Sequence, residues 1–480
     1  MAFTTLVWFR SDLRLSDNQA LSWAAARGAV VPVFVWAPEE EQPWSPGAAS
    51  RWWLHHSLER LSEDLRGRGS RLVLRTGPSI EALVAVARET NAKAVAWVGG
   101  SSPGAVVRDA RVRAELTGTG LQVEVGGGDL LFEPEEVATR KGTGYQVFTP
   151  FWRAALRAGA PHVPWAAPAR LAAPVQWPAS LRLGELGLLP RIDWAEGLRA
   201  AWVPGEGGAQ ARLKHFLDAG LHAYPDRRDR PDLDGTSRLS PHLHFGEISP
   251  RQVWDAVRVA TARHRAMGWV AAGETFLRQL GWREFGHHLL RASPHLPERS
   301  LHPRFEHLRW RRDSAGTEAW RQGRTGYPIV DAGMRELWAT GFMHNRVRMI
   351  AASFLVKDLL VDWRVGARWF WDTLVDADLA NNTLGWQWVA GSGPDASPFV
   401  RVFNPVLQGT RFDPQGTYVR RWVPELARLP DRYVHEPWTA PSAVLAGADV
   451  SLGGSYPRPI VDHRTARLRA LAVYARVSRL

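Results

Sequence analysis

Residues 6–9 read Leu-Val-Trp-Phe, and residues 30–36 read Val-Val-Pro-Val-Phe-Val-Trp. They are two of five short apolar runs in the first 130 residues, the others being 71–75, 94–98 and 121–125. Short runs that are apolar on both faces predict buried strands of a parallel sheet. The intervening segments 50–66, 79–90 and 103–116 predict helices. This alternation predicts an open, Rossmann-like α/β sheet.

The composition changes twice after this region. Residues 131–206 hold few long periodic segments, and residues 160–190 are rich in Pro and Ala, which predicts a linker wrapped over the surface. From residue 207 the pattern is helical. A chain of 480 residues has room for such a plan. We therefore expect an α/β domain at 1–130, a linker at 131–206 and an all-α domain at 207–480.

The bulk composition narrows the functional classes. The net charge is +12, and nearly all of the positive charge comes from arginine. Because the planar guanidinium group of arginine binds phosphate well, we expect a nucleic-acid partner. A basic soluble protein without such a partner is the alternative. The absence of cysteine excludes disulfides and thiolate catalysis. The His pairs lack a third ligand at a credible spacing, so no metal site is expected. No signal peptide and no membrane-spanning run is found, which predicts a cytoplasmic protein.

Residues 376–388 read Asp-Ala-Asp-Leu-Ala-Asn-Asn-Thr-Leu-Gly-Trp-Gln-Trp and carry the most chemistry for their length. The carboxylates of Asp376 and Asp378 can fix a ribose or a ring N–H. An asparagine such as Asn382 can contact a redox centre, and a tryptophan beside that centre can pass it an electron. An irregular helix junction with packed tryptophans is the plainer alternative.

Three further segments place polar groups together. The loop with Thr236, Ser237 and Ser240 runs into a proline-started helix, where it could cradle a phosphate, although a Ser N-cap explains Ser240-Pro241 equally well. Residues at i, i+3 and i+4 share a helix face, as in the triplets Gln279/Trp282/Arg283 and Asn345/Arg348/Met349. The first triplet could stack and read a base, or be a packed Trp with surface polar neighbours.

Taken together, the segments resemble the photolyase/cryptochrome family over almost the whole chain. The shared motifs, in order, are Val-Trp-Phe-Arg-Ser-Asp-Leu-Arg-Leu-Ser-Asp-Asn (7–18), Ser-Arg-Trp-Trp-Leu-His-His-Ser (50–57), Phe-Thr-Pro-Phe-Trp (148–152), Thr-Ser-Arg-Leu-Ser-Pro (236–241), Trp-Arg-Glu-Phe (282–285), Thr-Gly-Tyr-Pro-Ile-Val-Asp (325–331), residues 343–349, Trp-Gln-Trp (386–388) and Arg-Val-Phe-Asn-Pro (401–405). The resemblance implies an α/β antenna domain and a helical FAD domain.

The resemblance also implies the residues that hold the cofactor FAD, whose active form is FADH⁻. Asn382 matches the position facing flavin N5. The implied FAD contacts are Tyr224, Thr236, Ser237, Leu239, Ser240, Phe276, Arg283, Arg348, Asp376, Asp378 and Asn382. The implied photoreduction chain is Trp386, Trp363 and Trp310, which the local sequence alone would describe as separate core residues.

The implied activity is that of a deoxyribodipyrimidine photo-lyase, a carbon–carbon lyase acting on UV-damaged DNA. Blue light excites the reduced flavin, which gives an electron to a pyrimidine dimer flipped out of the duplex. Trp282 and Trp388 match the plates that flank the dimer. The other implied DNA contacts are Gln279, Asn345, Met349, Arg228, Arg346 and Arg401.

Two departures leave alternatives open. Gln279 stands where members that repair cyclobutane dimers carry Glu, and Gln also occurs in the (6-4) branch; Met349 stands where (6-4) enzymes carry His. We expect cyclobutane dimers, with (6-4) repair or a cryptochrome-type photoreceptor without repair as alternatives. The loop after residue 97 departs from the pattern near the antenna site. Residues 50–57 favour methenyltetrahydrofolate over 8-hydroxy-5-deazaflavin as any antenna chromophore. A monomer without an obligate protein partner is expected.

Overall fold

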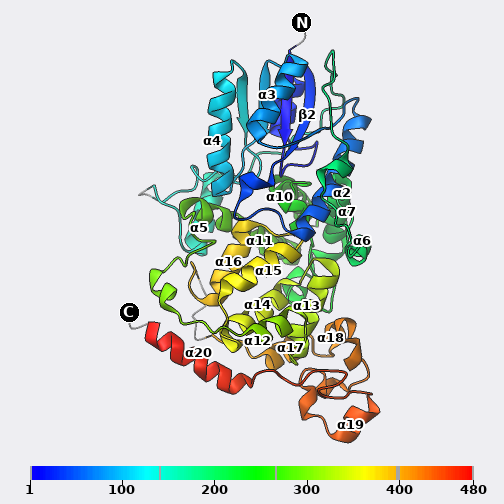
Figure 1. Cartoon of the computed structure of the whole chain (residues 1–480), viewed down its shortest axis with the longest axis vertical. Coiled ribbons are helices and arrows are strands. Elements are labelled where there is room, and N and C mark those ends of the chain that lie inside the picture. The colour runs from blue at the N-terminus through cyan, green and yellow to red at the C-terminus, as the bar shows by residue number, and fades with distance from the viewer. Residues whose placement is uncertain (1–2, 140–141, 265–266, 396–400, 478–480) are drawn as a thin grey trace. The chain divides into compact units, whose positions relative to one another are not determined.

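The computed structural model describes residues 3–139, 142–264, 267–395 and 401–477. The chain forms two compact units (Figure 1). Unit 1 consists of Met1–His222, Ser237–Pro294 and Val375–Ala380, and unit 2 of Ala223–Thr236, His295–Leu374 and Asn381–Leu480. These units differ from the ranges 1–130, 131–206 and 207–480, and those domain boundaries stay a prediction.

The predicted parallel sheet is confirmed in unit 1. Its strands are β1 (Thr4–Phe9), β2 (Ala29–Trp36), β3 (Val73–Thr76), β4 (Ala94–Val98) and β5 (Gln122–Gly126). All pairs are parallel, in the order β3-β2-β1-β4-β5, and Thr5 of β1 lies opposite Val30 of β2 and Ala94 of β4. Strand β1 is buried throughout, because the sheet is covered on both faces.

Helices on both faces of the sheet explain the continuous apolar runs. Leu83 of α3 and Leu116 of α4 pack with Leu6 and Trp8 on one face. The helices of unit 1 are α1 (Gln19–Ala25), α2 (Ala48–Gly67), α3 (Ser79–Thr90), α4 (Pro103–Gly118), α5 (Phe148–Ala158), α6 (Glu196–Ala201), α7 (Glu206–His215), α9 (Ser240–His244), α10 (Pro250–His264) and α11 (Met267–Ala292).

Unit 2 is helical, as the pattern beyond residue 207 predicts. Its helices are α8 (Tyr224–Arg227), α12 (Ser314–Arg321), α13 (Pro328–Thr340), α14 (Asn345–Ser353), α15 (Trp363–Thr373), α17 (Pro405–Phe412), α18 (Thr417–Trp422), α19 (Ser442–Gly447) and α20 (His463–Val477). Helix α16 (Leu379–Ala390) belongs to it from Asn381 onward. Within the described ranges, no helix is long and apolar enough to cross a membrane.

The expected linker is only partly irregular. Residues 171–181 run along the sheet: Val30 N donates to Ala172 O at 2.9 Å, and Leu181 N donates to Leu74 O at 3.0 Å. Helix α5, however, lies inside residues 131–206, where we expected a linker with few periodic segments. That expectation is corrected for Phe148–Ala158, which form a regular helix. Its buried residues Phe148, Phe151, Trp152 and Ala155 form one apolar face at helical spacing, a pattern that the Pro- and Ala-rich flank obscured.

Two adjacent glycines of α7 provide a test of this packing. A Cβ on Gly208 would lie 1.8 Å from Val203 O, whereas a Cβ on Gly207 would meet nothing within 4 Å. We expect Gly208→Ala to lower the free energy of unfolding by about 1–3 kcal/mol, because the backbone at 203 must shift. We expect Gly207→Ala to raise it by about 0.5–1 kcal/mol through helix propensity. Urea unfolding of both variants measures this, and equal effects would contradict the close approach.

Candidate functional site

Helix α11 carries four of the predicted site residues, Phe276, Gln279, Trp282 and Arg283, and buried polar bonds fix it to residues 129–132. Glu284 Oε2 accepts hydrogen bonds from Leu131 N at 2.8 Å and from Phe132 N at 3.4 Å. His288 Nε2 lies 2.9 Å from Phe132 O. Since Glu284 is fully buried, these bonds replace its hydration and set the rotation of the helix.

Arg283 is paired within this cluster. Its Nη1 donates to Asp129 O at 3.0 Å and to Glu284 Oε1 at 3.2 Å, and its Nη2 lies 3.4 Å from Asp129 Oδ1. Burial raises the pKa of Glu284 to about 7, although Arg283 opposes the shift. Burial also opposes ionisation of Asp129, but Arg283 and His287 lower its pKa overall. The charge of Arg283 is therefore directed at carboxylates rather than at a surface face.

Trp282 is a stacked plate. Its ring lies 3.8 Å from that of Phe148, with an angle of 6° between the planes, so Phe148 of α5 covers one indole face. The guanidinium of Arg278 lies 4.8 Å from the centre of the same Phe148 ring. Gln279, one turn earlier on α11, is partly exposed, and its Nε2 lies 3.5 Å from Thr275 O. Phe276 is buried against Phe216, with 4.6 Å between ring centres.

Asp376 and Asp378 belong to unit 1, and their carboxylates are engaged by other residues of that unit. Ser240 Oγ donates to Asp376 Oδ2 at 2.6 Å, and Asp378 Oδ2 lies 3.5 Å from His287 Nε2. Ser240 is the first residue of α9 and makes no cap bond, so the N-cap explanation of Ser240-Pro241 is wrong. Its hydroxyl bonds a distant carboxylate, which local sequence could not reveal.

A buried chain of polar groups leads away from Asp378. Ser101 Oγ donates to Asp129 Oδ2 at 2.6 Å and lies 2.9 Å from His287 Nδ1. Because serine has a single proton, which goes to Asp129, the nitrogen Nδ1 must be the donor to Ser101. Burial lowers the pKa of His287, while the nearby carboxylates of Asp378 and Asp129 oppose the shift. His287 lies one turn after Arg283 on α11 and was not among the predicted site residues.

The loop before α9 places the remaining phosphate-side residues. Ser237 O accepts a hydrogen bond from Arg212 Nε at 2.9 Å, and Ser237 Oγ accepts from Leu239 N at 3.4 Å. Leu239 is buried, whereas Thr236, the last residue of its segment of unit 2, is partly exposed. Arg238 between them has a φ of 51°, a left-handed turn that reverses the chain.

Within unit 2, Tyr224, Arg228 and Arg346 gather around Asp229. Arg346 Nη2 lies 2.8 Å from Asp229 Oδ2, and Arg228 Nε lies 3.9 Å from Oδ1. The guanidinium of Arg228 lies 5.5 Å from the ring centre of Tyr224. Burial raises the pKa of Tyr224 to about 12, so its hydroxyl stays protonated as a hydrogen-bond donor.

Helix α14 presents the predicted triplet. Asn345 is exposed, and its Nδ2 lies 3.9 Å from Met349 Sδ. Arg348 Nε donates to Met343 O at 2.6 Å. The helix begins at a buried histidine: His344 Nδ1 accepts a hydrogen bond from Arg346 N at 3.2 Å. Burial lowers the pKa of His344 to about 4, which keeps Nδ1 available as the cap acceptor.

Trp386 is buried in an aromatic cluster of unit 2. Its ring centre lies 5.0 Å from that of Phe370 and 6.4 Å from that of Trp320, and a Cβ on Gly366 would lie 2.0 Å from its Cη2 atom. Trp320 was not among the predicted site residues, because contacts between distant segments leave no local signal in the sequence. Trp363 is buried, and Trp310 is partly exposed.

The remaining predicted residues also lie in unit 2. Asn382 Nδ2 donates to Ala367 O at 3.0 Å, which fixes the orientation of its amide. Arg401 is exposed, and its carbonyl accepts a bond from Lys357 Nζ at 2.8 Å. Trp388 is partly buried near the C-terminal end of α16.

Comparison with known proteins covers both parts of the chain. Residues 5–169 match the family profile described as DNA photolyase, and residues 276–476 match the profile described as FAD binding domain of DNA photolyase. The chain is 49% identical to a deoxyribodipyrimidine photo-lyase of Agrobacterium fabrum, over 99% of this chain and 98% of that protein. It is 44% identical to cryptochrome-2 of Arabidopsis thaliana, over 96% of this chain and 77% of that protein.

A solved structure is similar in fold as well. The crystal structure of a class III photolyase from Agrobacterium tumefaciens superposes with a TM-score of 0.96 at 48% identity. The match covers 100% of this chain and 98% of that one.

The histidine cap of α14 predicts a pH dependence of stability. In the unfolded chain His344 has its ordinary pKa of 6.5, whereas in the folded chain the pKa is about 4. Between pH 4 and pH 6.5 the unfolded state binds more protons at His344 than the folded state does. The contribution of His344 to the free energy of unfolding is therefore complete above pH 6.5 and is lost as the pH falls toward 4. We expect the contribution of His344 to the free energy of unfolding to fall by about 2 kcal/mol between about pH 7.5 and about pH 5.

His344→Asn is the matched variant, because asparagine keeps a side-chain cap acceptor but does not titrate. Urea unfolding at both pH values should show that the variant loses less stability on acidification than the wild type. The same loss in both proteins would contradict the assignment.

Proposed function

The chain belongs to the photolyase/cryptochrome family, and we propose that it is an FAD-dependent enzyme that splits cyclobutane pyrimidine dimers in DNA under blue light. The observation that carries this proposal is the 49% identity, over essentially full length, to a deoxyribodipyrimidine photo-lyase. The reaction class is that of a carbon–carbon lyase. The net charge of +12 is consistent with a DNA substrate.

The chemistry of the predicted residues fits a flavin dinucleotide. The hydroxyl of Ser237 and the loop around it are donors suited to phosphate. Asp376, oriented by Ser240 Oγ at 2.6 Å, and Asp378 are acceptors suited to ring N–H and ribose hydroxyls. We propose as the FAD contacts Tyr224, Thr236, Ser237, Leu239, Ser240, Phe276, Arg283, Arg348, Asp376, Asp378 and Asn382.

Bound, reduced FAD supplies the electron that opens the cyclobutane ring, and the side chains orient and protect that chemistry. We propose that Asn382 accepts a hydrogen bond from the flavin ring, since its amide nitrogen is already engaged by Ala367 O. Trp386, Trp363 and Trp310 would relay electrons to the flavin from outside. The burial of Trp386 and the partial exposure of Trp310 support this direction.

We propose that Trp282 and Trp388 flank the flipped-out dimer. The stack of Phe148 on one face of Trp282 supports this role, because it makes the indole a rigid plate and limits base stacking to the other face. Gln279, Asn345 and Met349 would contact the dimer. The backbone phosphates would be gripped by the arginines Arg228, Arg346 and Arg401.

A photoreceptor without repair activity is the rival function. It is favoured by Gln279 and by the 44% identity to a plant cryptochrome, of which this chain spans 77%. Asn382 favours repair, since plant cryptochromes carry Asp facing N5. Met349 in place of the His of (6-4) enzymes favours cyclobutane dimers.

We further propose methenyltetrahydrofolate rather than 8-hydroxy-5-deazaflavin as the antenna chromophore. We also propose that the protein is a monomer without an obligate protein partner.

Single-lesion oligonucleotides test the reaction directly. With photoreduced protein under blue light, we expect loss of the cyclobutane dimer and no change in the (6-4) product, measured by chromatography. The dark reaction is the control. Repair of the (6-4) product alone would show that Met349 does not determine the preference for cyclobutane dimers. Repair of neither lesion, together with normal flavin photoreduction, would favour the photoreceptor function.

The tryptophan relay predicts a separation of two activities. We expect Trp386→Phe to slow photoreduction of oxidised flavin by at least roughly tenfold, because phenylalanine is far harder to oxidise, while chemically reduced enzyme repairs dimers at the wild-type rate. Absorbance under illumination and the repair assay measure the two. Trp254→Phe, at another buried site, is the control. Equal loss of both activities in Trp386→Phe would contradict the relay.

A further inference from the structure

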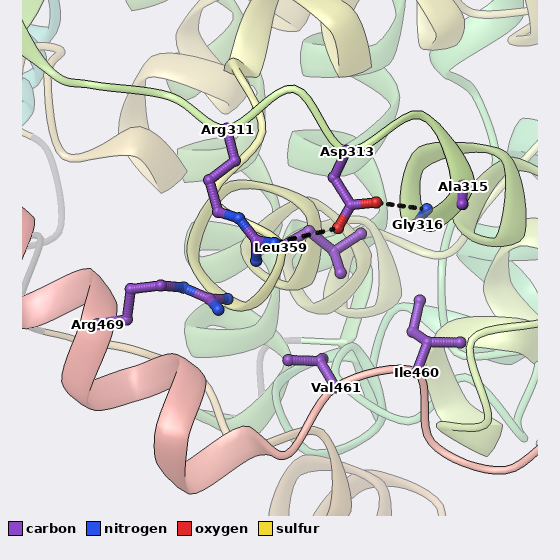
Figure 2. Close-up of a pocket in the computed structure, with 8 residues that line it drawn as sticks. All are labelled: Arg311, Asp313, Ala315, Gly316, Leu359, Ile460, Val461 and Arg469. Atoms are coloured by element: carbon purple, nitrogen blue, oxygen red, sulfur yellow. Dashed lines mark hydrogen bonds and ion pairs between the residues drawn. The ribbon is translucent and has the colours of Figure 1, made fainter.

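A cavity of about 410 Å³ lies within unit 2, and none of the eight residues that line it is among those proposed to contact FAD or DNA (Figure 2). Its walls are apolar at Leu359, Ile460 and Val461. Two guanidinium groups reach into it from different segments, Arg311 from the irregular stretch before α12 and Arg469 from α20. A cavity of this volume admits a small organic molecule.

The carboxylate in this cavity does not neutralise both arginines. Asp313 Oδ1 accepts a bond from Gly316 N at 2.8 Å as the cap of α12, and its Oδ2 lies 4.0 Å from Arg311 Nη2, at the limit of an ion pair. Arg469 Nη2 donates to the backbone carbonyl oxygen of Asp358, which carries no charge. Among the described residues, the buried Nε of Arg469 has no hydrogen-bond partner. A buried donor without a partner is costly.

Charges of both signs surround Arg469. The buried Asp358 carboxylate is engaged by His463 Nδ1 at 2.5 Å. Burial lowers the pKa of Arg469 and the charge of Arg311 adds to the shift, while Asp358 and Asp313 oppose it. Two cations that repel each other at one cavity form a site for an anion, and apolar walls beside them select an organic one.

Trp310 does not line the cavity, but it is linked to both of the segments that carry the cavity's arginines. Trp310 directly precedes Arg311 and packs on a cluster that includes Phe305, Leu308 and Ala470, and Ala470 directly follows Arg469. Trp310 is partly exposed and is the outer end of the proposed relay. Once it has passed an electron inward, its indole carries a positive hole that an external donor must fill.

We propose that this cavity binds a small enediolate anion, of which ascorbate is the probe, and that the bound anion re-reduces Trp310. The proposal rests on the proposed function. One electron passes from the enediolate monoanion to the indole radical cation, which returns to neutral tryptophan. The oxidised anion loses its hydroxyl proton to water and leaves as a radical. The delocalised oxygens of an enediolate suit two guanidiniums, and among the described residues that line the cavity none is an aromatic that could stack a nicotinamide.

The first test is binding in the dark, measured by anaerobic titration calorimetry of ascorbate into the flavin-loaded protein. We expect Arg311→Gln and Arg469→Gln each to weaken binding about tenfold, the effect of one charge-assisted hydrogen bond. Arg467→Gln, exposed on the same helix, should bind as the wild type does. Flavin absorbance and urea midpoints establish that the variants are folded. Binding that is absent, or equal in all four proteins, would overturn the proposal.

The second test is flavin photoreduction at increasing concentrations of reductant. With ascorbate we expect saturation in the wild type and Arg467→Gln, and about tenfold slower reduction at low concentration in the two cavity variants. With the neutral reductant dithiothreitol, all four proteins should react alike. Equal dependence on ascorbate in all four would overturn the proposal while leaving the relay intact. A wild type that is photoreduced with neither reductant would instead refute the proposed light chemistry, and this inference with it.

Discussion

The buried carboxylate of Glu284 is the constraint on which the functional face of unit 1 depends. It is held by the N–H groups of Leu131 and Phe132 and by Arg283, so α11 can occupy only one rotation against residues 129–132. A rotation that exposed Gln279 and Trp282 differently would leave a carboxylate and two backbone donors without partners, at a cost of several kcal/mol. The polar cluster therefore determines which α11 residues can meet a substrate.

Unit 2 also contains a buried carboxylate held by hydrogen bonds, Asp331, in the segment that leads to α14. Asp331 is fully buried and accepts bonds from Thr325 N, Thr325 Oγ1, Gly326 N and Tyr456 OH, all between 2.6 and 3.0 Å. Four donors compensate one desolvated carboxylate, and together they fix the turn before α13. Helices α13 and α14 are then joined by a short turn whose His344 caps the second helix. Asn345 and Met349 of α14, which are proposed to contact the dimer, are thus positioned by buried polar bonds in the segment that precedes the helix.

Most elements with a clear local periodicity could be predicted from the sequence. All five strands were expected close to where they form, because a strand buried on both faces is apolar throughout. Helix α5 was missed, although Phe148, Phe151, Trp152 and Ala155 have helical spacing. His287 could have been found as the next turn after Arg283. The partners Ser240–Asp376 and Trp320–Trp386 could not, because each joins segments far apart in sequence.

The proposed relay faces an electrostatic problem that the cavity beside Trp310 resolves. In the proposed relay, a positive hole would move from the dry surroundings of Trp386 to the partly exposed Trp310 because water stabilises charge, and the positive charges of Arg311 and Arg469 would oppose its arrival. An anion held between them cancels that repulsion. The same occupant would then both draw the hole outward and fill it, which couples electron entry to the presence of the donor.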